Sequence, residues 1–484
     1  MRGIVLRARR CFTYRFGLAL LLIGLGLGLA PPLALAANPI QTENALPGDW
    51  EWYIDGPLAT NGEIEGYTNL PSYNRGETIT FYISTTSPKY KITIFRVGWY
   101  DGVGGRAVTT TVTRTGGIKQ AVPAPNATTG LVDAGWKASY TLKVPTTWTS
   151  GFYLAKLETV TGGYQRYIPF VVRNDASTST YLFQSPANTW QAYNSWGGKS
   201  LYSYNSTNGI PASKVSFNRP YDVDGSGALF SWEINMAHFL EREGYDVTYA
   251  TNYETDNNPN LLLNHKAFLS VGHDEYWTWK MRQNVEAARA KGIHLGFFGS
   301  NDCYWQIRYE ASPVNGAARR TIVAYKYDAL TKDPYALDTN KSNDKYITTT
   351  WRDAPVNLPE EALIGVMYHG DPVDGNIVVA DASHWIYNGT GLSNGDVLPG
   401  LLGYETDASF GKAPAGTQVI AHSPDPFGYA DMSVYTWQPS GAVVFAAGSL
   451  QFTWGLDSWW EGLEHPAVQT MTRNILARFA GPAQ

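Results

Sequence analysis

Cysteine is nearly absent from this chain of 484 residues, which contains only Cys11 and Cys303. Cys11 lies in an N-terminal segment that we expect to be removed, so the remaining protein can form no internal disulfide bond. The sequence also lacks the His-Glu-x-x-His, His-x-His and Cys-pair patterns of zinc sites. It has no Gly-x-Gly-x-x-Gly opening a helix and no complete Gly-x-x-x-x-Gly-Lys-Ser/Thr phosphate loop. These absences argue against conventional zinc enzymes, dinucleotide-binding enzymes and P-loop NTPases.

Residues 1–36 have the features of a secretory signal peptide. Arginines precede an uncharged run from Phe16 to Leu29, and Ala34-Leu-Ala36 offers a small-x-small cleavage site. Arg9-Arg10 also resembles the start of a twin-arginine signal, so the choice between the Sec and Tat routes stays open. We expect a secreted or extracytoplasmic protein, which would be held at a membrane only if this segment stayed uncleaved.

Basic residues are too few for a nucleic-acid-binding protein. Removing residues 1–36 takes away five arginines and no acid, which leaves 32 basic and 42 acidic groups and a formal charge of −10. A surface with this balance repels the phosphate backbone. Aromatic residues are abundant instead, with 17 Trp and 31 Tyr, and such residues line sugar-binding surfaces as well as cores. No internal repeat or low-complexity tract is present.

Two kinds of pattern divide the mature chain. Residues 38–174 contain short alternating runs, such as 78–83 and 90–96, separated by Gly, Pro and Asn turns, which predicts an immunoglobulin-like β-sandwich. From residue 178 to residue 484, strands alternate with helices, as in the helical spacing of 229–243 before a strand at 246–250. This second part predicts a three-layer α/β domain with a mostly parallel sheet. The polar stretch 326–353 has no assignment beyond an insertion or a lid.

Two apolar runs end at glycine and are followed by polar residues. Gly272 precedes His273-Asp-Glu275, and Gly299 precedes Ser300-Asn-Asp302. Strands joined by one helix form a parallel βαβ unit, so both polar clusters are predicted at the carboxyl edge of one sheet, where α/β proteins bind ligands. A purely structural interpretation is also open, in which Asp274 caps a helix and Glu275 faces its dipole.

The residue types near this edge favour oxygen ligands. Glutamate and tyrosine oxygens, with histidine close by, suit ferric iron or another hard cation. A cysteine nucleophile is a weaker alternative, because Cys303 lies beyond the strand end and not on a strand-to-helix elbow.

The sequence resembles the large-subunit family of N,N-dimethylformamidase. In the α/β part the resemblance lies in Ala192-Tyr-Asn-Ser-Trp-Gly-Gly198, Phe217-Asn-Arg-Pro220, Ser270-Val-Gly-His-Asp-Glu-Tyr-Trp277, Gly299-Ser-Asn-Asp-Cys-Tyr-Trp305 and Gly403-Tyr-Glu405. In the β part it lies in Arg96-Val-Gly-Trp-Tyr-Asp-Gly102 and Ser150-Gly-Phe-Tyr-Leu-Ala155. The resemblance implies an immunoglobulin-like domain joined to a glutaminase-like α/β domain, and an amidase with one Fe³⁺ ion held by two tyrosines and a glutamate.

Carried over by motif, the resemblance assigns the metal ligands and their neighbours. It implies Tyr153, Tyr193 and Glu275 as iron ligands. His273, Glu405 and Asn301 correspond to the surrounding acid, base and orienting groups. The implied substrate is a small amide.

Each assignment and the function itself have alternatives. Tyr153 fits an ordinary strand tyrosine, and Asn301 fits a turn cap. That family works with a small partner subunit inside the cell, whereas this chain carries an export signal, so a partner subunit and a homo-oligomer both stay open. A secreted carbohydrate- or surface-binding protein without catalysis is the rival function.

Overall fold

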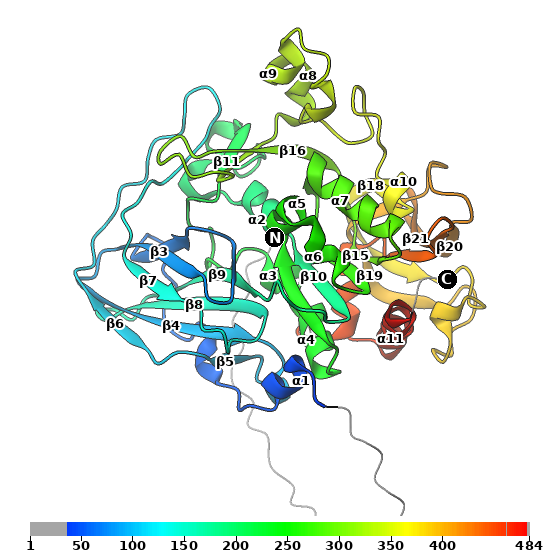
Figure 1. Ribbon diagram of the computed structural model, residues 1–484, viewed down its shortest axis with the longest axis horizontal. Helices are drawn as coiled ribbons and strands as arrows, with labels where there is room; N and C mark the ends of the chain where they lie inside the picture. The colour runs from blue at the N-terminus through cyan, green and yellow to red at the C-terminus, as the bar shows by residue number, and fades with distance from the viewer. Residues whose placement is uncertain (1–35, 461, 482–484) are drawn as a thin grey trace, which may run out of the picture. The chain divides into compact units, whose positions relative to one another are not determined.

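The computed structural model describes residues 36–460 and 462–481, and their strands pair into five sheets (Figure 1). The predicted signal peptide, residues 1–36, lies outside the described residues except for its last position. Among the residues described, no helix has the length and apolar character needed to cross a membrane. Residues Asn38–Gln484 make up one compact unit, so the predicted division between 38–174 and 178–484 stays a prediction.

Two sheets from the first third of the chain pack face to face as a β-sandwich. The smaller sheet has the order β1 (Ile64–Thr68), β3 (Thr78–Thr85), β7 (Tyr140–Lys143). The larger has the order β2 (Ser72–Asn74), β9 (Gln165–Arg173), β8 (Gly151–Thr159), β4 (Lys89–Val97), β5 (Gly105–Ala107), with β6 (Val112–Thr115) on β4. Alternate residues such as Ile79, Phe81, Ile94 and Ile168 fill the space between the sheets.

The largest sheet contains seven strands, five of them parallel. Its order is β12 (Val247–Thr251), β10 (Tyr181–Ser185), β13 (Ala267–Gly272), β15 (His294–Gly299), β22 (Ala442–Ala446), β21 (Gly428–Trp437), β20 (Gln418–Asp425). The pairs from β12 to β22 are parallel, and β21 and β20 are antiparallel. The predicted mixture of sheets and helices is confirmed, with a largely parallel sheet in the second part.

Helices cover both faces of this sheet. The strand residues alternate between two cores, so Leu182 and Phe268 pack with α6 (Pro259–Leu263) and α7 (Trp279–Ala290), whereas Phe183 and Leu269 pack with α4 (Ile234–Arg242) and α11 (Pro466–Ala480). This alternation follows from the period of two in a strand buried on both faces. The other helices are α1 (Pro39–Asn44), α2 (Ala187–Tyr193), α3 (Leu229–Trp232), α5 (Asn252–Asn257), α8 (Ala329–Lys332), α9 (Pro334–Leu337) and α10 (Glu361–Ile364).

The βαβ unit that positions the polar edge is confirmed. β13, α7 and β15 follow one another, and β13 pairs in parallel with β15 from Ala267↔His294 to Gly272↔Gly299. The short strand β14 (Tyr276–Thr278) intervenes before the helix, so Thr278 caps α7. Asp274 is therefore not the helix cap that the structural interpretation expected.

Two smaller sheets complete the fold. One has the order β11 (Lys214–Ser216), β17 (Thr321–Val323), β16 (Trp305–Glu310), β14, and the other pairs β18 (Met367–Val378) with β19 (Val397–Ala408). The unassigned stretch 326–353 contains α8, α9 and short 3₁₀ turns at Lys326–Asp328 and Asp344–Tyr346.

A buried ion pair joins the β-sandwich to the helices of the second part. Arg96 in β4 donates to both carboxylate oxygens of Glu241 in α4, at 2.7 and 2.8 Å. Both side chains are almost completely shielded from solvent. A bidentate contact of this kind fixes orientation as well as distance.

Many aromatic residues belong to the core. Trp52, Trp277, Trp305 and Trp351 are among the largest fully buried side chains. At these four positions, the tryptophans build the interior and not a sugar-binding surface.

Candidate active site

Three oxygen-bearing side chains meet beyond the carboxyl end of β13. The hydroxyl of Tyr193 donates to Oε2 of Glu275 at 2.9 Å. The hydroxyl of Tyr202 lies 2.9 Å from both Oε1 and Oε2 of the same carboxylate. The two phenol rings stack, with their centroids 4.2 Å apart. Two phenols and one carboxylate therefore converge from segments about 80 residues apart in the chain.

Local structure explains how these side chains arrive together. Tyr193 is the last residue of α2, and Tyr202 follows the 3₁₀ turn Trp196–Gly198. Glu275 lies between β13 and β14, where its backbone N–H donates to the hydroxyl of Thr189 in α2 at 3.0 Å. This bond ties the carboxylate segment to the helix that carries Tyr193.

Arg219 fixes the loop between Tyr193 and Tyr202 through hydrogen bonds. Its guanidinium is fully buried and donates to the carbonyls of residues 191, 194, 196 and 199, and to the side-chain oxygen of Gln191, at 2.6–3.2 Å. All five N–H groups are used, as the planar fork of arginine allows. Arg219 belongs to the segment Phe217–Pro220, one of those that carry the family resemblance. This segment therefore stabilises the loop that contains the two tyrosines.

A second chain of polar contacts adjoins the tyrosine–glutamate cluster. Nε2 of His273 lies 2.9 Å from Oε2 of Glu405 and 3.3 Å from Oε2 of Glu275. Asn301 donates through Nδ2 to Oε2 of Glu405 at 2.7 Å. The backbone of Asn301 has a positive φ of 55° and its N–H donates to Asp407 at 2.8 Å. The structure thus brings together five of the six predicted site residues.

Burial and charge set the protonation of these groups. Burial opposes the imidazolium, but the carboxylates of Glu405 and Glu275 outweigh it and raise the pKa of His273 well above its usual value. Burial likewise opposes the carboxylate of Glu275, yet the hydrogen bond and charge of His273 lower the pKa of that group. His273 is therefore charged and lies between two carboxylates.

The two phenols require a cation to lose their protons. Burial first, and then the charge of Glu275, raise the pKa of both Tyr193 and Tyr202. Tyr276 donates its hydroxyl to the oxygen of Tyr202 at 2.6 Å, which supports negative charge on that oxygen. Only a strong local positive charge would make phenolates of both side chains near neutral pH.

Lys326 supplies one positive charge at the rim of this cluster. Its ammonium group lies 3.4 Å from the ring centroid of Tyr202 and 4.9 Å from that of Trp305. Burial lowers the pKa of Lys326 to about 8, although Glu275 and Glu405 act in the opposite direction. The backbone of Lys326 is held at a φ of 57°, a conformation that non-glycine residues seldom adopt.

The donor set fits a small, hard metal ion. The Tyr202 and Tyr193 hydroxyls lie 2.9 Å from Oε2 of Glu275, an ordinary hydrogen-bond length, so the fit to a metal ion rests on the chemistry of the three oxygen donors and not on this spacing. Phenolate and carboxylate oxygens favour Fe³⁺ over soft metals. Within the described residues, no group of three or more His, Cys, Asp or Glu side chains is suited to a metal ion.

Tyr153 is not part of this cluster, and the structure does not bring it together with the other predicted ligands. Its ring stacks on Trp148 and Phe170 inside the β-sandwich, and its hydroxyl donates to the carbonyl of Thr149 at 2.6 Å. The physical reason is the period of a strand: Phe152 and Leu154 face the α/β part, so the side chain between them must face the interior of the sandwich.

Cys303 does not have the surroundings of a nucleophile. Its side chain is fully buried in a hydrophobic core, and burial raises the pKa of its thiol well above the usual value. Reactive cysteines need a lowered pKa and access to the substrate. The cysteine alternative is therefore not favoured.

Tyr202, Lys326 and Tyr276 were not predicted as site residues. Tyr202 lies nine positions after Tyr193, just past the segment 192–198 that carries part of the family resemblance. A longer segment at this place would have included it as a candidate. Lys326 opens the stretch that has no clear pattern, so only the folded chain places it. Tyr276 follows Glu275 directly and was available as a candidate.

Comparisons with known proteins bear on the family. No curated protein matches the chain. Two solved structures, a family 123 glycoside hydrolase from Clostridium perfringens and a calcium-binding mutant of Bacteroides uniformis beta-glucuronidase 2, each share 9% identity with it. The first match covers 48% of this chain and 68% of the other, with a TM-score of 0.11, and the second covers 49% and 34%, with a TM-score of 0.12. Structural similarity this low says nothing about the fold or the function of this chain.

The family model that describes the C-terminal part of N,N-dimethylformamidase beta subunit-like proteins matches residues 91–467. This range covers most of the chain and contains every residue of the site described above. The chain therefore belongs to the N,N-dimethylformamidase beta subunit-like family.

Proposed function

We propose that this protein is an iron-dependent hydrolase of small or N-substituted amides. The observation that carries the proposal is the convergence of Tyr193, Tyr202 and Glu275 oxygens at 2.9 Å, next to a charged His273–Glu405 pair. Membership of the dimethylformamidase-like family supports amide hydrolysis as the reaction class.

Tyr193, Tyr202 and Glu275 would hold the metal ion. Two phenolates and one carboxylate carry a charge of −3, which balances Fe³⁺ and leaves coordination positions free. When bound, a ferric ion supplies Lewis acidity toward the amide carbonyl and the attacking water. Tyr276 would then stabilise negative charge on the Tyr202 oxygen through its hydrogen bond, and the ammonium of Lys326 would do so from its place over the Tyr202 ring.

His273 and Glu405 are placed to move protons. Nε2 of His273 lies 2.9 Å from Oε2 of Glu405, and the charged imidazole can deliver its proton to the departing amine nitrogen. Glu405 can accept a proton from the attacking water as general base. Asn301 holds Glu405 by one N–H of its amide group and keeps the second N–H for the oxygen of the substrate.

Iron content measured together with turnover tests this proposal. Purified protein should contain about one iron per chain, show the visible colour of tyrosinate bound to ferric iron, and release amine from members of a panel of small amides. An iron-free, colourless protein that binds glycans and hydrolyses no amide would instead support the rival function of a secreted carbohydrate-binding protein.

We further propose that the protein is exported and that it assembles with another chain. Residues 1–36 support export, because they have the charge pattern and cleavage site of a signal peptide. The family description names a beta subunit, which supports a partner subunit or a homo-oligomer. N-terminal sequencing of the exported protein and its native mass test these two points.

A further inference from the structure

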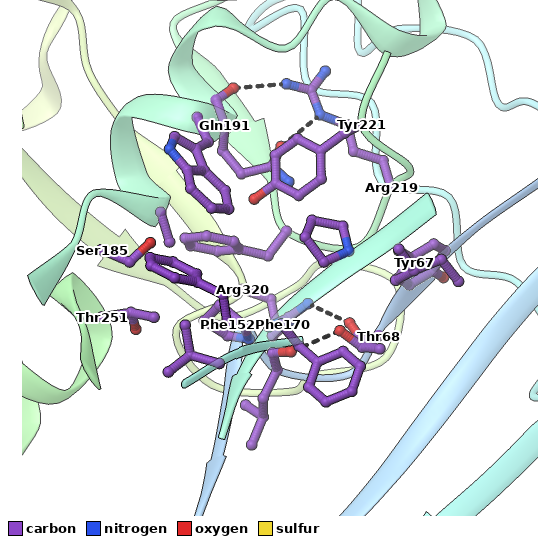
Figure 2. Close-up of a pocket in the computed structure, with 18 residues that line it drawn as sticks. Tyr67, Thr68, Phe152, Phe170, Ser185, Gln191, Arg219, Tyr221, Thr251 and Arg320 are labelled. Carbon is purple, nitrogen blue, oxygen red and sulfur yellow. Dashed lines mark hydrogen bonds between the residues drawn. The ribbon is translucent and has the colours of Figure 1, made fainter. Parts of the chain in front are cut away.

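A small, mostly buried cavity lies between the β-sandwich and the α/β part. Its volume is about 30 Å³. Thr68, Phe152 and Phe170 line it from the sandwich strands, and Ser185 at the end of β10 and Arg320 line it from the second part (Figure 2). Most of its wall is apolar, so the few polar groups that face it determine what it can hold.

Two of these polar groups have no hydrogen-bond partner. Ser185 is fully buried, and its hydroxyl makes no hydrogen bond. Arg320 is only 2% exposed; its Nε donates to Asn218 at 2.8 Å and its Nη2 to the carbonyl of Thr68 at 3.2 Å, but its Nη1 has no partner. Figure 2 shows the contact of Arg320 with Thr68. Unpaired buried donors are costly, so we expect a ligand to satisfy them.

The positive charge at this cavity is not neutralised by a close carboxylate. Arg219 also lines the cavity, and in the described parts of the chain neither Arg219 nor Arg320 has a carboxylate within 4.0 Å. The carboxylate of Asp133 attracts the charge of Arg320 only from beyond this distance. Asp133 instead accepts a hydrogen bond from Ser312 at 2.7 Å. In agreement, burial lowers the pKa of Arg219 to about 10 and also lowers the pKa of Arg320.

We propose that this cavity binds one small inorganic anion of the size of chloride. A water molecule needs about 10–15 Å³ of such volume, so the cavity holds about two waters or one halide, and it excludes carboxylates, phosphates and amide substrates. The unpaired groups, a guanidinium N–H and a hydroxyl, can both donate. The charge of Arg320, which has an unpaired N–H group, then favours an anion over neutral water, whereas Arg219 adds positive charge but no free donor, because all five of its N–H groups are used. The proposal does not depend on the amidase activity.

The anion would connect the β-sandwich to the α/β part, because the arginines that line the cavity also hold other segments of the chain. Arg320 reaches β1 through Thr68, and Arg219 holds the loop that carries the tyrosines. Filling the cavity should therefore stabilise the whole folded chain without contacting the amide site. Thermal stability, and not turnover, is the appropriate measurement.

Crystals of the full chain grown or soaked in bromide test the site directly. The expected result is an anomalous peak in the cavity within hydrogen-bonding distance of Arg320 and Ser185. In solution, Tm should rise saturably with chloride, by about 3 °C at a concentration near 100-fold above Kd, relative to gluconate of equal ionic strength.

Ser185→Ala is the most informative variant. Arg320→Met also removes the hydrogen bonds to Asn218 and Thr68, whereas Ser185→Ala removes only a donor to the ion. It should abolish most of the chloride-dependent rise in Tm. Ser433→Ala is the matched control, because Ser433 is a fully buried, unpartnered serine of the same sheet that does not line the cavity, and it should keep the full rise. Waters alone in the cavity, or an equal chloride effect in both variants, would overturn the proposal.

Discussion

The hydroxyl of Tyr202 lies 2.9 Å from each carboxylate oxygen of Glu275. This contact is possible because Arg219 folds the loop before Tyr202 back against α2, so that Tyr193 reaches the same carboxylate. As the structure stands, the two phenols satisfy the buried carboxylate by donating hydrogen bonds to it, and the same three side chains offer oxygen ligands to a cation. The contact between these two residues is the reason why the proposed metal site includes Tyr202 in place of Tyr153.

Tyr202→Phe and Tyr193→Phe should each weaken iron binding by more than about 100-fold, because each removes an oxygen ligand while the ring still packs. The visible absorption of tyrosinate–iron should fall with the iron content. Tyr153→Phe is the matched control, since it removes the hydroxyl of a tyrosine buried in the sandwich. Iron loss in Tyr153→Phe with full occupancy in Tyr202→Phe would reverse the assignment.

His273→Gln and Glu405→Gln should keep the iron and its colour but lower kcat by roughly 10² to 10⁴-fold, the usual contribution of a general acid or base. Both side chains lie beside the proposed ligands without being ligands in this assignment. Iron content and steady-state kinetics on the same preparations separate the two effects. Normal turnover in both variants would remove these residues from the mechanism.

Sequence patterns predict much of the frame of this protein. The glycine-ended apolar runs at 267–272 and 294–299 become paired parallel strands, and His273, Glu275 and Asn301 emerge at one edge as expected. These predictions succeed because the carboxyl ends of neighbouring parallel strands must coincide. Glu405 arrives from β19, far along the chain, and only the family resemblance pointed to it.

The places where the structure differs from the sequence patterns have physical causes as well. Tyr153 was assigned by motif alone, although strand periodicity sends its side chain to the sandwich interior. The helix expected over 229–243 is confirmed as α3 and α4, which adjoin at Glu233, a residue with helical backbone angles. Lys326 comes from a segment without hydrophobic periodicity, so no local pattern could place it.

Arg219→Met should destabilise the protein by at least about 3 kcal/mol, because it leaves four buried carbonyls without donors. The tyrosine loop should loosen at the same time, so iron affinity should fall although no ligand is changed. Equilibrium unfolding and iron titration of the variant measure both effects. Arg473→Met, at an exposed ion pair with Glu243, is the control and should stay within about 0.5 kcal/mol of the wild type. A folded Arg219→Met protein with unaltered iron affinity would contradict this account of the loop.

Cys303→Ala should keep its iron and nearly all of its turnover, because the thiol is buried and its pKa is raised. The native thiol should react with iodoacetamide only after unfolding. Mass spectrometry after alkylation, with and without denaturant, checks this directly. Rapid labelling of the folded protein together with loss of activity would revive a cysteine mechanism.

Iron occupancy of Glu275→Ala compared with the wild type tests the central claim most directly. Glu275 is the carboxylate on which both tyrosine hydroxyls converge, so its removal should abolish iron binding and the visible tyrosinate band while the chain stays folded. Full iron occupancy and unchanged colour in Glu275→Ala would contradict the assignment of this cluster as the metal centre.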